Sequence, residues 1–118
     1  AKKLVDHPEV AHVYYPTLDD GGIFDKQMSR GGGVISFEIK GDKKRAQTLL
    51  NRVSFIKVAV SLGDAETLIE HPATMTHAVI PEEDRINMGI TNTLIRLSVG
   101  LAAWEDIWDD LNESLTDL

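Results

Sequence analysis

The segment Leu94-Ile95-Arg96-Leu97-Ser98-Val99-Gly100 places a single arginine within a stretch of apolar, small and hydroxylated residues. Its apolar character and the glycine at its end are typical of a buried strand over residues 94–99. Alternate side chains of a strand point to opposite faces, so Arg96 should lie opposite Ile95 and Leu97. Because a guanidinium keeps its proton, a partly buried Arg96 needs a carboxylate or phosphate partner. That partner is more often an internal Asp or Glu than a ligand, and the residues alone leave both alternatives open.

The composition is that of one small, acidic domain. The chain has 118 residues, 42% of them hydrophobic, and a formal net charge of −7. This length suits a single core, and the negative charge argues against nucleic acid or an anionic membrane as a partner. Without cysteine, the chain has no disulfide, thiol nucleophile or zinc–thiolate site. No apolar run is long enough to span a bilayer and no signal-peptide pattern opens the sequence, so a cytoplasmic location is expected.

The expected fold is α+β, with a small, mostly antiparallel sheet of about four strands and helices on one face. Alternation and β-branched residues predict strands over residues 10–15, 34–40, 56–62 and 94–99. Apolar residues at helical spacing predict helices over residues 43–53, with Asp42 as N-cap, and over 104–115. Pro81, the three acidic residues after it and Gly89 as a stop predict a short helix over residues 81–88. We also expect a loop over residues 17–22, single helical turns over 23–28 and 66–70, and the end of an incomplete helix over 1–8.

Several conspicuous features have ordinary structural explanations. The triplet Gly31–Gly33 lacks the spacing of a phosphate-binding loop and precedes a strand, so it is expected to be a loop. His71 and His77 lack the spacing and the third ligand of a metal site, so local hydrogen bonding is expected and no metal. Trp104 and Trp108 lie at helical spacing and are expected in the core or at a domain interface. Acidic residues of the last helix are expected to point to solvent; these and their neighbours near the C-terminus are Glu105, Asp106, Asp109, Asp110, Glu113 and Asp117.

Ser61 is a second candidate binding residue besides Arg96. It stands at the end of the strand expected over residues 56–62, just before the turn Leu62-Gly63. Strand ends of this kind commonly carry ligand contacts, because loops there are positioned by a rigid sheet.

Three segments together carry a family resemblance. They are Val58-Ala-Val-Ser-Leu-Gly-Asp-Ala-Glu-Thr-Leu-Ile69, Glu70-His-Pro-Ala-Thr-Met-Thr-His77 and Gly89-Ile-Thr-Asn-Thr-Leu-Ile-Arg-Leu-Ser-Val-Gly-Leu101. In order and spacing they resemble the C-terminal region of the Cys/Met-metabolism family of pyridoxal-phosphate enzymes. Within that family the first segment looks most like the methionine γ-lyase branch. Cystathionine γ-lyase, cystathionine γ-synthase and O-acetylhomoserine sulfhydrylase share much of the pattern.

The resemblance implies a fold, a reaction and two site residues. A type I pyridoxal-phosphate enzyme has a large cofactor domain and a small C-terminal domain, and residues 1–118 look like the small one. The matching arginine of the family pairs with the substrate α-carboxylate, which implies that role for Arg96. The matching serine lines the same pocket, which implies substrate binding by Ser61. The implied reaction is γ-elimination from a sulfur amino acid by a carbon–sulfur lyase, in an enzyme that is a homotetramer when complete.

The resemblance also implies that part of the enzyme lies outside this chain. The family's Schiff-base lysine, its pyridine-nitrogen aspartate, its phosphate site and its stacking tyrosine have no identifiable counterpart here. We therefore expect the missing large domain to bind pyridoxal phosphate, and we expect this chain alone to have no catalytic residue and no activity. Its partners would be the sulfur amino-acid substrate and the remainder of the enzyme.

The chain departs from the family pattern at two places. Ala102-Ala103 stand where the family usually has an acidic pair, so the last helix is expected to lack an acidic cap. The loop over residues 17–24 also fits poorly. Two other hypotheses remain open at this stage: a free-standing, non-catalytic domain that binds a small ligand, and an α+β domain whose Arg96 is paired internally.

Overall fold

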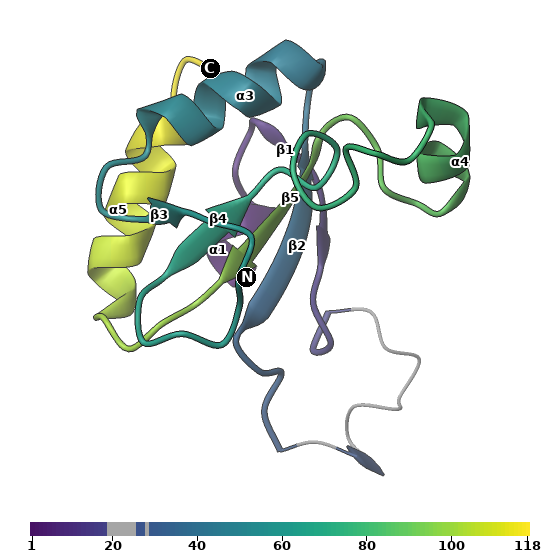
Figure 1. Cartoon of the computed structure of the whole chain (residues 1–118). Coiled ribbons are helices and arrows are strands. Elements are labelled where there is room, and N and C mark those ends of the chain that lie inside the picture. The colour runs from purple at the N-terminus through teal and green to yellow at the C-terminus, as the bar shows by residue number, and fades with distance from the viewer. Residues whose placement is uncertain (19–25, 28) are drawn as a thin grey trace.

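The computed structural model describes residues 1–18, 26–27 and 29–118, and these contain five strands joined in one sheet. The strand order is β1-β2-β5-β4-β3, in which β3 and β4 are parallel and the other neighbours are antiparallel (Figure 1). The expected α+β fold with a mostly antiparallel sheet is confirmed, with five strands in place of about four. The strands are β1 (Val10–Tyr14), β2 (Val34–Ile39), β3 (Lys57–Val58), β4 (Leu68–Glu70) and β5 (Leu94–Ser98).

The additional strand is β4, and the helical turn predicted over residues 66–70 is wrong. All three residues of β4 are buried, so the segment has no alternation by which a strand could be recognised. It pairs with β5 on one side and with β3 on the other. The strand predicted over residues 56–62 is shorter than expected: β3 ends at Val58, and the Ala59 N–H makes one further hydrogen bond to the Ile69 carbonyl oxygen of β4.

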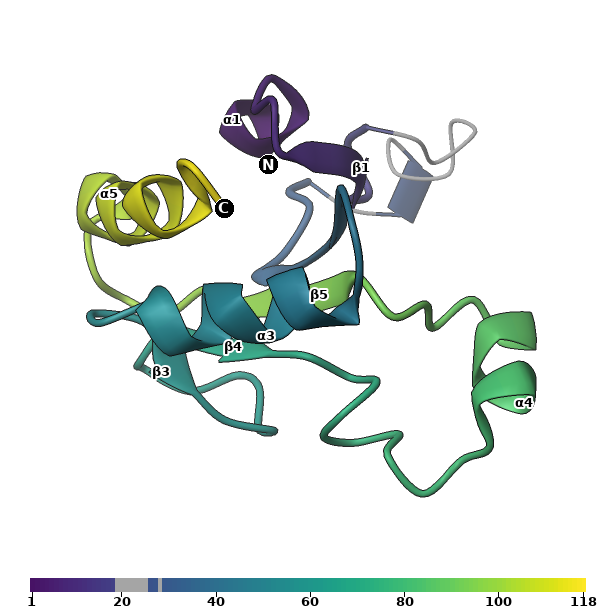
Figure 2. The same ribbon diagram turned by 90° about the horizontal axis from the view of Figure 1, so that it is seen from above.

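Three helices cover one core. Side chains from α1 (Lys2–Val5), α3 (Lys43–Arg52) and α5 (Trp104–Leu115) join the inward-facing residues of the sheet in a single apolar cluster. On β2 the alternation is as predicted, since Ile35, Phe37 and Ile39 are buried. The short helix α4 (Glu82–Asn87) stands apart from the sheet and from the other helices (Figure 2). The core thus occupies one face of the sheet, and the other face carries polar residues together with Leu68 and Leu94.

Helix ends largely follow the expected chemistry. The Asp42 side chain accepts a hydrogen bond from the Arg45 backbone N–H at 3.1 Å, so its predicted role as N-cap is confirmed. Gly89 follows α4 with a φ of 86°, a conformation that favours glycine. α5 begins after Ala103, whose methyl side chain has no acceptor for the first free N–H groups.

The predictions for α5 have different outcomes, and the one for Asp110 is wrong. Trp104 is 57% exposed and lies outside the core, because it is the first residue of the helix; its alternative place at a domain interface stays a prediction. Trp108, at the same helical spacing, is partly buried and packs against the core as expected. Asp110 was expected to point to solvent, but it is 9% exposed and turns toward the segment after α3.

The predicted helical turn over residues 23–28 lies largely outside the described residues, as does most of the loop over 17–22. Within the described ranges, none of the helices combines the length and apolar character that a membrane crossing requires.

Candidate functional site

A row of polar side chains crosses the face of the sheet opposite the core. The strand register pairs Tyr14 of β1 with Ser36 of β2, Ser36 with Arg96 of β5, and Arg96 with Glu70 of β4. Directly paired residues of antiparallel strands share a face, so these side chains form a continuous line across four strands. Arg96 lies on this face because its neighbours Ile95 and Leu97 fill the core side.

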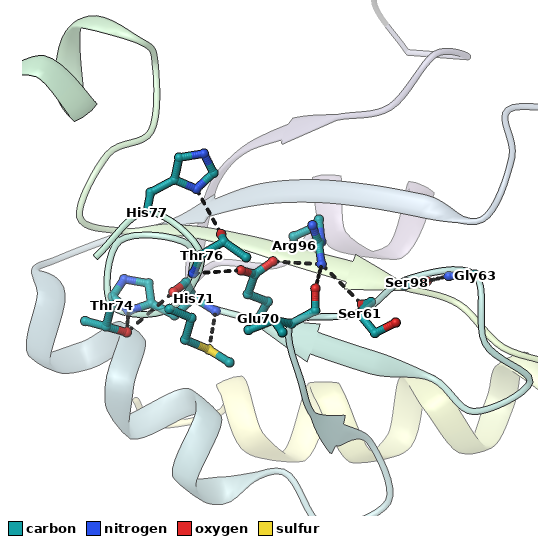
Figure 3. A network of polar contacts seen from close by, with 11 residues as sticks. Ser61, Gly63, Glu70, His71, Thr74, Thr76, His77, Arg96 and Ser98 are labelled. Carbon is teal, nitrogen blue, oxygen red and sulfur yellow. Dashed lines mark hydrogen bonds and ion pairs between the residues drawn. The ribbon is translucent and has the colours of Figure 1, made fainter. Parts of the chain in front are cut away.

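Arg96 has an internal carboxylate partner. Its Nη2 lies 2.8 Å from Oε2 of Glu70, and the two side chains are 21% and 1% exposed, respectively. The same nitrogen donates hydrogen bonds to the backbone carbonyl oxygens of Val60, at 2.8 Å, and Ser61, at 3.2 Å (Figure 3). Among the residues that the structure describes, these polar contacts of Arg96 all use Nη2. The donors on Nε and Nη1 are not used by them.

Glu70 connects Arg96 to the segment that follows β4. Its second oxygen, Oε1, accepts a hydrogen bond from the backbone N–H of Thr76 at 3.2 Å (Figure 3). A buried carboxylate needs partners on both oxygens to offset the loss of hydration, and here one oxygen faces a cation and the other an amide. Glu70 therefore fixes Arg96 and the segment around Thr76 relative to one another.

The structure brings Ser61 next to Arg96 through the Ser61 backbone, and substrate binding by its side chain stays a prediction. Ser61 is exposed, and its carbonyl oxygen makes the contact. The turn that follows is held by a second residue of β5, because the Gly63 N–H donates to Oγ of Ser98 at 3.1 Å. Arg96 and Ser98 thus fasten the segment over residues 60–63 to the sheet from the same face of one strand.

Sequence reasoning missed Glu70 and Ser98. Glu70 was assigned to a helical turn, and its contact with Arg96 depends on β4 lying beside β5, which no local pattern reveals. Ser98 shares the face of Arg96 two residues away, and this spacing within a strand was the available signal.

His71 makes the local hydrogen bonds expected of it. It is fully buried, with Nε2 2.7 Å from the Asn92 carbonyl oxygen and Nδ1 2.8 Å from the Thr74 hydroxyl. A carbonyl only accepts, so Nε2 carries the proton of the neutral ring. Burial lowers the pKa of His71, and this outweighs the opposing effect of the bond to Asn92. In the described part of the chain, no group of three or more His, Cys, Asp or Glu side chains is arranged to hold a metal ion.

The chemistry open to this face is the binding of an anionic group. A guanidinium offers five N–H donors in a planar fork that matches a carboxylate. Arg96 is partly exposed, and the described contacts engage only its Nη2. An incoming carboxylate would meet a cation whose position is already fixed.

Comparison with known proteins identifies the family. The family model described as "Cys/Met metabolism PLP-dependent enzyme" matches residues 1–116, nearly the whole chain. The chain belongs to this family. Its members depend on pyridoxal phosphate (PLP), so the expected family and cofactor are confirmed.

Several curated and solved members of the Cys/Met-metabolism family are similar to this chain. An L-methionine gamma-lyase of Fusobacterium nucleatum subsp. polymorphum is 49% identical, over 98% of this chain and 31% of the relative. A cystathionine beta-lyase of Coxiella burnetii is 47% identical, over 98% of this chain and 30% of the relative. The crystal structure of cystathionine gamma-lyase from Lactobacillus plantarum, complexed with L-serine, superimposes with a TM-score of 0.86 at 42% identity; the match covers 96% of this chain and 30% of that chain. The chain thus spans about a third of the length of these relatives.

Proposed function

We propose that residues 1–118 form the C-terminal domain of a PLP-dependent carbon–sulfur lyase and bind the α-carboxylate of its amino-acid substrate through Arg96. The observation that carries the proposal is that Arg96, on the polar face of the sheet, is held in place and still partly exposed. Its Nη2 is anchored by Glu70 and two carbonyl oxygens, while the side chain remains 21% exposed. A charge-assisted pair with a carboxylate there would contribute about 1.5–3 kcal/mol and would set the orientation of the substrate.

The internal partner of Arg96 is compatible with this role. A single carboxylate does not use all the donors of a guanidinium, so Arg96 can hold Glu70 and a ligand at the same time. Ser61 lies beside Arg96 and is exposed, which supports its proposed part in the same pocket. The crystal structure of the Lactobacillus plantarum relative contains L-serine, an amino acid with the α-carboxylate that the proposal requires.

The described residues do not by themselves fit a PLP site. A Schiff-base lysine has to be desolvated or placed next to other cations to be reactive, whereas the lysines of this chain are all exposed: Lys2, Lys3, Lys26, Lys40, Lys43, Lys44 and Lys57. We therefore propose that a large domain outside these residues holds PLP, and that this chain alone is inactive. The homotetrameric state and the cytoplasmic location stay predictions.

The specific reaction proposed is γ-elimination from methionine, which gives a thiol, ammonia and a 2-oxo acid. The L-methionine gamma-lyase at 49% identity supports it, and the cystathionine beta-lyase at 47% identity keeps β-elimination from cystathionine as a second candidate. Cystathionine γ-lyase, cystathionine γ-synthase and O-acetylhomoserine sulfhydrylase remain further alternatives.

Intact mass and absorbance of the natural protein test the domain assignment first. A larger chain that carries the absorption band of bound PLP would support it. Lyase activity from the purified chain of 118 residues alone would overturn it.

Product analysis then decides the reaction. Methionine should give methanethiol and 2-oxobutanoate. Cystathionine should give cysteine by γ-cleavage, whereas homocysteine and pyruvate would indicate the β-lyase.

The complete enzyme also tests Arg96. Replacement by lysine should weaken binding of L-norleucine, an unreactive analogue of methionine, and leave binding of norleucinamide unchanged, because the amide lacks the carboxylate. Equal effects on both ligands, or none, would contradict carboxylate binding by Arg96.

A further inference from the structure

Glu70 is a buried charge that the proposed function does not yet use. Its side chain is 1% exposed, although the residue ends a strand at the polar face of the sheet. A carboxylate so deeply buried is costly unless its charge is matched. Its charged partner is Arg96, and its remaining oxygen is satisfied by the Thr76 N–H.

The contacts of Glu70 restrict where the Arg96 guanidinium can point. An arginine side chain has many rotamers, and fixing one of them costs conformational entropy when a ligand binds. Here Nη2 is already held from two sides, by Glu70 on β4 and by the carbonyl oxygens of Val60 and Ser61 in the segment after β3 (Figure 3). Because the guanidinium is planar, fixing Nη2 from these directions also fixes the plane that contains Nε and Nη1.

Glutamine would not reproduce these contacts. Both neighbours of the Glu70 carboxylate, Arg96 Nη2 and the Thr76 N–H, are donors. A glutamine amide has one accepting oxygen and one donating nitrogen, so one of the two contacts would be lost. Aspartate keeps both accepting oxygens and the charge but is one methylene shorter.

We propose that Glu70 is a positioning residue for substrate binding, which holds Nη2 of Arg96 so that the remaining donors face the substrate α-carboxylate before it arrives. Glu70 acts through Arg96 and does not itself contact the substrate. This inference rests on the proposed function of Arg96 as the carboxylate ligand.

The test compares two ligands in the complete PLP enzyme that carries this chain. L-norleucine has the α-carboxylate, norleucinamide lacks it, and neither has a sulfur leaving group. Their dissociation constants follow from the change in cofactor absorbance on binding. Glu70→Gln removes the ion pair with Arg96, so it should weaken norleucine binding by about tenfold and leave norleucinamide binding unchanged. Glu70→Asp should lie between the wild type and Glu70→Gln.

Glu38→Gln is the matched control. Glu38 is a carboxylate on the same face of the sheet, but it accepts hydrogen bonds from Tyr14 and Thr91. This variant should leave the ratio of the two dissociation constants unchanged. In an Arg96→Lys background, Glu70→Gln should cause no further loss of the preference for norleucine, because its effect passes through the guanidinium.

The outcomes separate the inference from the function on which it rests. If Arg96→Lys lowers the preference for norleucine and Glu70→Gln does not, only the inference fails. Equal weakening of both ligands by Glu70→Gln would indicate a merely structural role, and tighter norleucine binding would make Glu70 a competitor of the substrate; either result overturns the inference. If Arg96→Lys itself does not distinguish the ligands, the proposed function fails. Should Glu70→Gln not fold, Glu70→Asp carries the same comparison.

Discussion

Arg96 and Glu70 form an ion pair across the neighbouring strands β5 and β4, in which the arginine is partly exposed and the glutamate is buried. This difference in exposure gives the ion pair two roles, one in stability and one in access to the guanidinium. The buried partner makes the pair important for stability, and the exposed partner leaves part of the guanidinium accessible. Stability and ligand binding can therefore be measured separately.

Arg96→Ala should destabilise the chain. The variant leaves the Glu70 carboxylate buried without its cation, and breaking a buried pair is costly. Because Arg96 is partly exposed, we expect a loss of about 2–3 kcal/mol in the free energy of unfolding, below the usual value for a fully buried pair. Urea unfolding of wild type and variant measures it.

Arg45→Ala is the control for this experiment. Arg45 pairs with Glu9, and both side chains remain substantially exposed, 33% and 28% respectively. Exposed pairs contribute little, so the loss should stay below about 1 kcal/mol. Equal losses for Arg45→Ala and Arg96→Ala would contradict the distinction between the two pairs.

Stability should fall on mild acidification because of His71. Burial lowers the pKa of His71 in the folded chain, while the unfolded value is about 6.5. The unfolded state therefore binds the proton more readily, so the contribution of His71 is present above pH about 6.5 and is lost as the pH falls through the folded pKa. The free energy of unfolding, measured between pH 7 and pH 5, should show this slope.

His71→Gln should reduce that slope, since glutamine does not titrate. The exposed His12 supplies the control, and His12→Gln should retain the slope of the wild type. An unchanged slope in His71→Gln would assign the acid sensitivity to other groups.

Asp110→Asn should destabilise the connection between α3 and β3. The Asp110 carboxylate accepts hydrogen bonds from the backbone N–H groups of Ser54, Phe55 and Ile56 and from the Ser54 hydroxyl. Asparagine has no charge, and its amide NH2 group would face N–H groups that are themselves donors. We therefore expect a loss of about 2–4 kcal/mol in the free energy of unfolding. Asp109 is the neighbouring exposed carboxylate of α5, and Asp109→Asn should change stability by less than about 0.5 kcal/mol. Thermal or urea unfolding distinguishes the two variants.

Gly100→Ala should destabilise the segment that connects β5 to α5. A Cβ at Gly100 would overlap the Ala65 carbonyl oxygen and come within 2.6 Å of the Glu66 carbonyl carbon, and backbone atoms do not move aside cheaply. We expect a loss above about 2 kcal/mol, as for other overpacked sites. Gly33→Ala is the control, because its Cβ would meet only the Val99 carbonyl oxygen, at 3.4 Å. Similar stability of the two variants would show that the backbone at Ala65 and Glu66 can move to make room for the added methyl group.

Ala103→Asp should stabilise α5. Ala103 is the N-cap of this helix, and an aspartate would supply both an acceptor for the first N–H groups and a negative charge at the helix N-terminus. The expected gain is about 0.5–2 kcal/mol in the free energy of unfolding. Ala102→Asp, one residue earlier, should gain less; an equal gain would point to charge alone and not to capping.

The helices and strands that sequence predicts well are those with long periodic patterns. α3 and α5 begin at the predicted residues, because each carries an apolar stripe over several turns. β4 was missed because its three residues are all buried and form no pattern. The sequence left Trp104 between the core and a domain interface, because periodicity gives a direction around the helix axis but not the point at which the core ends.

The candidate site divides in the same way. Arg96 could be recognised as a cation in an apolar strand, and the family resemblance suggested a ligand for it. The identity of its internal partner depends on strand order, which brings β4 beside β5 and places Glu70 opposite Arg96. Ser61 contacts Arg96 through its backbone carbonyl oxygen. Every residue has such an oxygen, so the residue type at position 61 could not predict this contact.

Residues 60 and 61 bind Arg96 through their backbone carbonyl oxygens, so these hydrogen bonds do not depend on the side chains at the two positions. Both residues are exposed. Charged, bulky or small side chains can therefore replace those at positions 60 and 61, in evolution or in a mutant library, without loss of the hydrogen bonds to Arg96. Under the proposed role of Arg96, substitutions at positions 60 and 61 would change substrate preference while the contact of Arg96 with the α-carboxylate stays the same.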